Sequence, residues 1–333
     1  MDVLSDVLSV VRLSGAVFFR ADFSAPWAVE SRRELLAAIV KPEVESVVLF
    51  HILVDGDCVI ECGALPAVSM EAGDVIVFPH GDLHTMRSHD GTRTTSIGSV
   101  LAPGSGDAMR QVSFGGGGRT SSFICGYLSC EQRFNPLIGS MPTMLLVRSR
   151  DEYAGIEAVD DRGRRATTVP EGSGTWLGTT LKFTINEAKA ARPGNAAMLG
   201  RLTELMFMEM LREYMQQLRA DQGGWLAGVK DPQVGKALRL LHADPARDWT
   251  VEELARETAV SRSVLAARFA DLVGESPMHY LFNWRMQLAK QMLRESRTVQ
   301  DVALRVGYES EAAFNRAFKR ATGAPPDAWR RAQ

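Results

Sequence analysis

The sequence predicts an α+β protein of several domains, with an N-terminal β-barrel, a helical middle segment and an all-helical C-terminal domain. Two patterns carry this prediction. Short runs of β-branched residues, bounded by Gly, Pro and Asp, fill the first half, and apolar residues at three- and four-residue steps fill the second. A length of 333 residues also suits more than one domain. We place the domains at residues 1–170, 171–222 and 230–333.

Composition excludes some classes of protein. The formal net charge is -2, so the whole chain is not a polycation, although residues 248–333 carry slightly more basic than acidic side chains. That balance permits nucleic-acid binding without requiring it. The chain has no apolar run of ~18 residues and its start lacks the basic residues of a secretory signal. We therefore expect a cytoplasmic protein without a membrane span, whose four cysteines are thiols or ligands rather than disulfides.

The first half is predicted to consist of strands joined by tight turns. In "VESVVLFHILVDGDCVIECG" two β-branched runs flank Asp55-Gly56, a dipeptide typical of β-hairpins. Cys58 and Cys62 share one face of the second run and are expected in the core. Further strands are expected in "GDVIVFPHG", "TRTTSIGSVLA" and "TSSFICGYLSC". Many short strands at this spacing predict a barrel or a sandwich.

Two helices are predicted in the middle segment. They correspond to "TWLGTTLKFTINEAKA" and "NAAMLGRLTELMFMEMLREYMQQL", separated by Arg192-Pro193-Gly194. The second is apolar around most of its circumference. Two interpretations remain open: the helices cover the core of the first domain, or they form the interface of a homodimer.

The last 85 residues contain an internal repeat. "TVEELARETAVSRSVLAARFADLVGESP" begins at Thr250, and "TVQDVALRVGYESEAAFNRAFKRATGAPP" begins at Thr298. Each copy is typical of a helix-turn-helix motif, in which the threonine begins the first helix and Ser261 or Ser310 begins the second. The buried positions of the second helices are predicted to be Leu265, Phe269, Phe314 and Phe318.

The spacing of the two motifs suits DNA. A second helix of this kind fits a major groove about 12 Å wide. Between the copies, "PMHYLFNWRMQLAKQMLRE" is long enough for one connecting helix of ~28 Å. Such a rod would hold the two second helices about one turn of DNA apart, so that both enter successive major grooves on one face.

The tandem motifs, the connecting "WRMQLAKQML" and the terminal "PPDAWRR" resemble the DNA-binding domain of AraC/XylS-type transcription regulators, from Val234 to Arg331. The resemblance implies that exposed positions of both second helices contact double-stranded DNA. Arg262 and Arg316 are the best candidates for base or adjacent phosphate contacts, and Lys319 and Arg320 suit phosphates. The full set is Arg262, Ser263, Ala266, Ala267, Glu311, Ala312, Asn315, Arg316, Lys319 and Arg320.

The first half also has a family resemblance. In "GDVIVFPHGDLH" the spacing of Gly, Pro, Gly and His resembles the second motif of cupin barrels, in which the last histidine, here His84, is a metal ligand. The first cupin motif should supply two more histidines and a glutamate, but the chain offers only His51 and Glu61. The first half as a whole resembles the cupin-type sensor domain of a subset of AraC-like regulators.

Histidines and cysteines of this domain are candidate metal ligands. His80, His84, Cys125 and Cys130 could hold a zinc ion, with His51 as a substitute ligand, because imidazole and thiolate groups together suit zinc. Two alternatives remain open. Cys125 and Cys130 could form a redox switch, or the cysteines could be ordinary core residues while His84 fills the barrel mouth.

We therefore predict a DNA-binding transcription regulator, an activator that works beside RNA polymerase. Its cupin-like domain would sense a small-molecule, metal or redox signal through different affinities for two arrangements of the protein. The alternative is a cupin metalloenzyme with an appended DNA-binding domain, against which the missing His-x-His pair argues. In a further alternative the first domain only dimerises.

Overall fold

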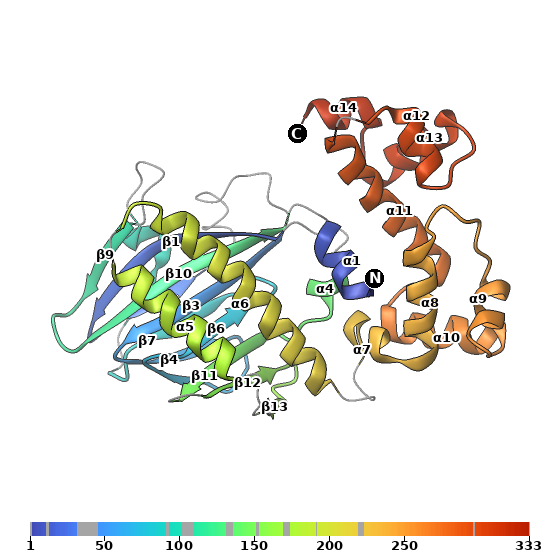
Figure 1. Cartoon of the computed structure of the whole chain (residues 1–333). Helices are drawn as coiled ribbons and strands as arrows, with labels where there is room; N and C mark the ends of the chain where they lie inside the picture. The colour runs from blue at the N-terminus through green and yellow to red at the C-terminus, as the bar shows by residue number, and fades with distance from the viewer. Residues whose placement is uncertain are drawn as a thin grey trace. The chain divides into compact units, whose positions relative to one another are not determined.

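The computed structural model describes residues 2–10, 13–31, 46–90, 93–101, 110–130, 136–150, 153–168, 174–190, 192–218, 223–295 and 297–332. The chain divides into two compact units (Figure 1). The sheet unit comprises Arg12–Arg133 and Met141–Gln217. The helical unit comprises Met1–Val11, Phe134–Ser140 and Leu218–Gln333.

The sheet unit contains two β-sheets. The eight-stranded sheet has the order β13-β12-β11-β6-β3-β10-β1-β9, and the five-stranded sheet has the order β5-β4-β7-β2-β8. The larger sheet consists of β1 (Leu13–Ser24), β3 (Ser46–Asp55), β6 (Val75–Phe78), β9 (Arg110–Gly115), β10 (Thr120–Cys130), β11 (Met144–Arg150), β12 (Tyr153–Val159) and β13 (Arg165–Thr168). The smaller sheet consists of β2 (Ala28–Ser31), β4 (Asp57–Cys62), β5 (Val68–Glu71), β7 (His84–Arg87) and β8 (Thr95–Ser96).

The two sheets face each other across one apolar core. Phe23, Phe78 and Phe123 enter it from the larger sheet, and Ile60 and Met86 enter it from the smaller one. Cys58 and Cys62 lie in the same core, as predicted. This arrangement confirms the β-rich, cupin-like first domain, although its described strands form two separate sheets and not the continuous barrel that was predicted.

The predicted hairpin at Asp55-Gly56 is wrong. Gly56 does form a tight turn, with φ 83°, but the strands on either side belong to different sheets. β3 pairs with β10 and β6, whereas β4 pairs with β5 and β7. The turn carries the chain around the corner of the sandwich, where a Cβ atom on Gly56 would lie 2.6 Å from the Thr120 carbonyl oxygen. An Asp-Gly pair specifies a sharp reversal and leaves the strands' partners unspecified.

The strand expected in "TRTTSIGSVLA" is also largely wrong. Within its described residues, 93–101, only Thr95–Ser96 pair as β8, and the chain then forms the short helix α3 (Ile97–Val100). Ile97 and Leu101 are buried in the core, so an apolar side chain anchors this turn of helix at each end.

Both predicted helices of the middle segment are confirmed. They are α5 (Gly174–Lys189) and α6 (Asn195–Gln217), which lie along the outer face of the eight-stranded sheet (Figure 1). On the inner side of α6, Met206, Phe207 and Met210 meet Phe50 and Leu128 of the sheet. The helices therefore cover the sheet, as one of the two interpretations predicted.

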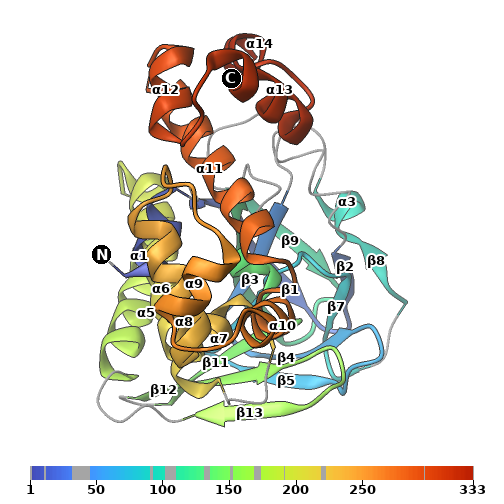
Figure 2. The same cartoon turned by 90° about the vertical axis from the view of Figure 1, so that its right-hand side faces the viewer.

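The helical unit contains the remaining helices. These are α1 (Val3–Val10), α4 (Pro136–Gly139), α7 (Trp225–Lys230), α8 (Pro232–Ala243), α9 (Val251–Glu257), α10 (Arg262–Val273), α11 (Pro277–Arg294), α12 (Val299–Arg305), α13 (Glu311–Thr322) and α14 (Pro326–Arg331). α11 is the predicted connecting helix: its 18 residues span ~27 Å. α12, α13 and α14 surround one end of it, and α10 contacts the other (Figure 2).

The internal repeat is visible in the backbone. Thr250 and Glu253 form a complete capping box at α9, and the Thr298 side chain accepts a hydrogen bond from the Asp301 N–H at α12. In the turns, Ala259 and Gly307 both have positive φ values, 59° and 81°. The two residues occupy equivalent positions of the repeat, so both copies bend in the same left-handed conformation.

The first helix of the chain packs within the helical unit rather than the sheet unit. Val3, Val7 and Val10 of α1 are buried, and α1 contacts α8 and α11. No helix in the described ranges is long and apolar enough to cross a membrane.

Candidate functional site

The second helix of the first motif, α10, exposes the residues predicted to contact DNA. The Ser261 hydroxyl accepts a hydrogen bond from the Val264 N–H and begins the helix, while Leu265 and Phe269 anchor it in the core. This anchoring leaves the predicted residues accessible: Arg262, Ser263 and Ala267 are exposed and Ala266 is half-buried.

The second motif has the same construction. The Ser310 hydroxyl accepts a hydrogen bond from the Ala313 N–H, and Phe314 and Phe318 are fully buried. On the other side of α13, the predicted residues Glu311, Ala312, Arg316, Lys319 and Arg320 are exposed and Asn315 is half-buried. All ten side chains are therefore open to a ligand, and their individual DNA contacts stay a prediction.

Local contacts orient two of the arginines. Arg262 Nη1 lies 2.7 Å from Glu252 Oε1, and both side chains are mostly exposed. Such an exposed ion pair is weak, so a phosphate or a guanine can compete for the guanidinium. Arg320 lies 5.2 Å from the centre of the Phe282 ring, which holds its guanidinium beside α13.

Sequence reasoning missed one residue of this surface. Val264 lies between the predicted residues on the first turn of α10 and is 50% exposed. Valine at a helical position normally indicates the core, so the sequence carries no signal for this exposure. A half-exposed valine on this face is a candidate for contact with a thymine methyl group.

In the sheet unit, three predicted residues form a buried chain. His51 from β3 lies between His84, at the start of β7, and Cys125 from β10. The His51 and His84 Nε2 atoms are 2.8 Å apart, and His51 Nδ1 lies 3.0 Å from Cys125 Sγ. None of the three is more than 4% exposed. We call these residues the histidine–cysteine chain.

The hydrogen-bond partners set the direction of the protons in this chain. His84 Nδ1 is 2.8 Å from the Asp82 carbonyl oxygen, which only accepts, so His84 donates from Nδ1 and accepts at Nε2. His51 must then donate from Nε2 and accept at Nδ1 from the Cys125 thiol. Burial lowers the pKa of His84 to about 4 and raises the pKa of Cys125, which keeps both groups neutral.

The predicted zinc ligands do not converge among the described residues. His80 is exposed, and its Nε2 lies 3.1 Å from the Met141 carbonyl oxygen. His84 and Cys125 contact different nitrogens of His51, so one ion cannot bind all three with the rings as they lie. The side chain of Cys130 is outside the described residues. In the described ranges no three His, Cys, Asp or Glu side chains are placed to hold a metal, and zinc binding stays a prediction.

Both units of the chain match families of known proteins. Residues 2–161 and 165–216 match the family model described as Cupin, and residues 254–332 match the one described as Helix-turn-helix domain. An AraC-like transcription regulator of Streptomyces lividans is 32% identical over 334 residues, which cover 99% of this chain and 98% of that protein. The HTH-type transcriptional regulator AlkR of Acinetobacter baylyi is 26% identical over 96% of each chain.

Among solved structures, the DNA-binding domain of AdpA in complex with a target DNA is 32% identical. The match covers 31% of the present chain and 92% of the AdpA domain, with a TM-score of 0.29. The full-length relatives are named as transcription regulators, which does not support the alternative of a cupin metalloenzyme. The chain belongs to the AraC-like DNA-binding transcription regulators that carry an N-terminal cupin domain.

Proposed function

We propose that this regulator is an activator that inserts α10 and α13 into successive major grooves of its operator and recruits RNA polymerase there. One observation supports the DNA contacts above all: of the ten residues predicted to contact DNA, eight are exposed and two half-buried, while a serine cap and buried aromatic anchors hold both helices in place. The role as an activator rests on the resemblance to AraC/XylS-type regulators. In this proposal the sheet unit receives a small-molecule signal.

Replacing Arg316 by alanine should weaken binding to the cognate site by ~1–3 kcal/mol, the contribution of a bidentate contact to guanine. Binding to random DNA of the same length should change less, because random sequence offers no matched base. Fluorescence anisotropy at one fixed salt concentration measures both affinities, since salt alone changes them strongly.

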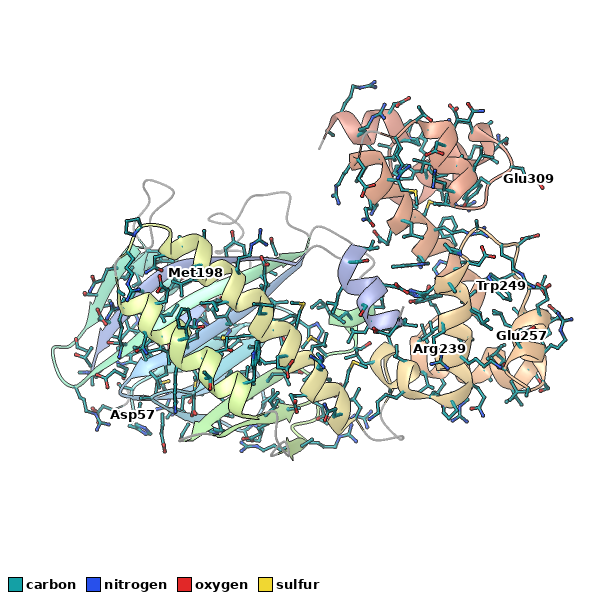
Figure 3. All side chains as sticks on the ribbon, in the orientation of Figure 1. Asp57, Met198, Arg239, Trp249, Glu257 and Glu309 are labelled. Atoms are coloured by element: carbon teal, nitrogen blue, oxygen red, sulfur yellow. The ribbon has the colours of Figure 1, made fainter. Side chains whose placement is uncertain are left out.

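Arg239→Ala is the matched control. Arg239 is an exposed arginine on α8, outside the two second helices (Figure 3). Its loss should leave the ratio of specific to random affinity unchanged. An equal loss on both DNAs in Arg316→Ala would show a phosphate contact instead of base recognition.

We also propose that the regulator is a homodimer joined through the outer faces of α5 and α6. Four large apolar residues are exposed on these helices: Trp176 and Phe183 on α5, and Met198 and Leu205 on α6, each 44–50% exposed. Met198 is labelled in Figure 3. The two residues on each helix are seven positions apart, so they lie on the same side of that helix. The two helices pack against each other, which joins the pairs into one surface, here called the outer stripe. Apolar surface gathered in this way is typical of protein interfaces.

Leu205→Asp should convert the dimer to a monomer, because the new carboxylate would have to be buried without a partner. Sedimentation velocity measures the change. Ala196→Asp is the control, since Ala196 is exposed on α6 and points away from Leu205. A dimer that survives Leu205→Asp at the concentration at which the control is dimeric would contradict the proposed interface.

A further inference from the structure

A pocket of about 660 Å³ opens at one edge of the sheet unit. Its walls come from the turn after β4, the loop before β7 and the turn between β12 and β13. Leu65, Leu83 and Cys62 provide apolar surface, and Asp82, Asp161 and Arg162 provide charge. A cavity of this size, with apolar walls and a few polar groups, suits a small organic ligand.

Asp82 gives the pocket its chemical preference. The Oδ2 atom of its carboxylate is buried and has no hydrogen-bond partner among the described residues. Burial, and to a smaller extent the negative charge of Asp82, raise the pKa of the Cys62 thiol to about 11. A buried acceptor without a donor destabilises the protein, so a ligand that donates a hydrogen bond to this oxygen, once the Asp82 side chain turns toward the pocket, regains that free energy.

The charges of the lining favour a cation. The charged residues of the lining are Asp82, Asp161 and Arg162, so acidic side chains outnumber basic ones there. An ammonium group combines positive charge with N–H donors, and its hydrogen bond to a carboxylate is stronger than one between neutral groups. An apolar body attached to it would bury the exposed side chain of Leu83.

Asp82 also connects the pocket to the core. Its side chain lines the pocket, while its carbonyl oxygen accepts the hydrogen bond from His84 Nδ1. That bond fixes the proton direction of the histidine–cysteine chain through His51 to Cys125 on β10. A ligand that moves Asp82 therefore changes the end of a buried chain that links three strands.

We infer that this pocket binds an organic ammonium ion with an apolar body, that the Asp82 side chain turns so that its Oδ2 atom accepts a hydrogen bond from an N–H group of the ligand, and that this movement perturbs the histidine–cysteine chain. The inference rests on the proposed function of the sheet unit as receiver of a small-molecule signal, and it names the chemical class of that signal.

Isothermal titration calorimetry on the full chain tests the selectivity, with octylammonium as the probe. Octanoate has a similar apolar body and the opposite charge, and octyltrimethylammonium has the charge without an N–H donor. We expect octylammonium to bind about tenfold or more tightly than either. Asp82→Asn should remove about the same factor, whereas Asp90→Asn, at an exposed position outside the pocket lining, should keep the wild-type affinity.

The nitrogen NMR signals of the imidazole rings test the connection to the core. Octylammonium should shift the signals of His84 and His51 in the wild type and leave them in place in Asp82→Asn. The inference is overturned if octylammonium does not bind, if octanoate binds equally well, if Asp82→Asn keeps the affinity, or if the ring signals do not move.

Operator binding separates this inference from the proposed function. Octylammonium that binds the pocket and shifts the ring signals, yet leaves operator affinity unchanged, would support the site and contradict its role as a sensor. Loss of operator recognition in Arg316→Ala leaves the pocket residues intact, so that variant should still bind octylammonium with wild-type affinity.

Discussion

Phe314→Ala is expected to destabilise the second helix-turn-helix motif by ~3–5 kcal/mol, the usual loss when a buried phenylalanine is truncated. The Phe314 ring is fully buried between Tyr308 and Phe318, with ring centres 5.6 and 5.5 Å away. Removing it leaves a cavity in a small core formed by α11, α12 and α13. Since whole domains are stable by only ~5–15 kcal/mol, a large part of the stability of this motif would be lost.

Hydrogen exchange followed by mass spectrometry can measure the loss in peptides of α12 and α13 separately from the rest of the chain. Leu304→Ala is the control. Leu304 is an apolar residue of α12 in the same motif, but it is 58% exposed, so its truncation should cost less than ~0.5 kcal/mol. Phe314→Ala should also lose specific operator binding, because α13 would no longer be held in place. Similar protection in the two variants would show that the core does not depend on this ring.

The repeat made the helical unit predictable because its signals are local. A serine that can cap a helix by accepting a hydrogen bond from the N–H three residues later can be recognised directly in the sequence. The same holds for two phenylalanines four residues apart, which share one side of a helix. Ser261 and Ser310 cap their helices as expected, and Phe269 and Phe318 are buried. The second helices also expose the predicted residues, since fixing the buried side of a helix fixes its opposite side.

Long-range partners were less predictable. Val3, Val7 and Val10 have helical spacing, which shows that α1 has an apolar side. The spacing does not show that this side packs on α8 and α11, more than 200 residues later in the chain. Asp55-Gly56 likewise showed a turn without showing that it connects two sheets.

The candidate site in the sheet unit had the same limit. His84 and Cys125 were recognised by residue type and spacing, and His80 and Cys130 were grouped with them as ligands of one ion. In the structure His84 turns toward His51, while His80 contacts a backbone carbonyl group. Strand pairing decided this, because β3 and β10 place His51 opposite Cys125. The sequence held no signal for that register.

A second large effect is expected from a buried histidine of the helical unit. His242 of α8 stacks on Trp284, with ring centres 4.2 Å apart, and its Nε2 lies 2.8 Å from the Tyr280 hydroxyl. Trp225 Nε1 also donates to that hydroxyl group. Burial lowers the pKa of His242 from 6.5 to about 3, since the charged imidazolium would lose its solvation. The Nδ1 atom has no hydrogen-bond partner in the described part of the chain.

This pKa makes the helical unit sensitive to acid. Above pH 6.5 the imidazole is neutral in both the folded and the unfolded chain, so its titration does not affect stability. Between pH 6.5 and about 3 only the unfolded chain binds the proton. Each pH unit of acidification in this range then lowers the free energy of unfolding by ~1.4 kcal/mol. Lowering the pH from about 7 to about 5 should therefore remove ~2 kcal/mol of stability. Asp6, whose carboxylate is 3.5 Å from His242 Nδ1, has a pKa raised by burial and reduces this loss only at lower pH.

His242→Gln tests the cause. Glutamine can keep a polar atom near the Tyr280 hydroxyl but does not titrate, so stability in the variant should stay nearly constant from about pH 7 to about pH 5. Arg239→Ala, on the exposed side of the same helix, should keep the acid sensitivity of the wild type. Exchange of amide hydrogens in α8 and α11, measured at both pH values and corrected for the intrinsic rate, reports the change. If His242→Gln loses as much protection as the wild type on acidification, a group other than this imidazole must bind the destabilising proton.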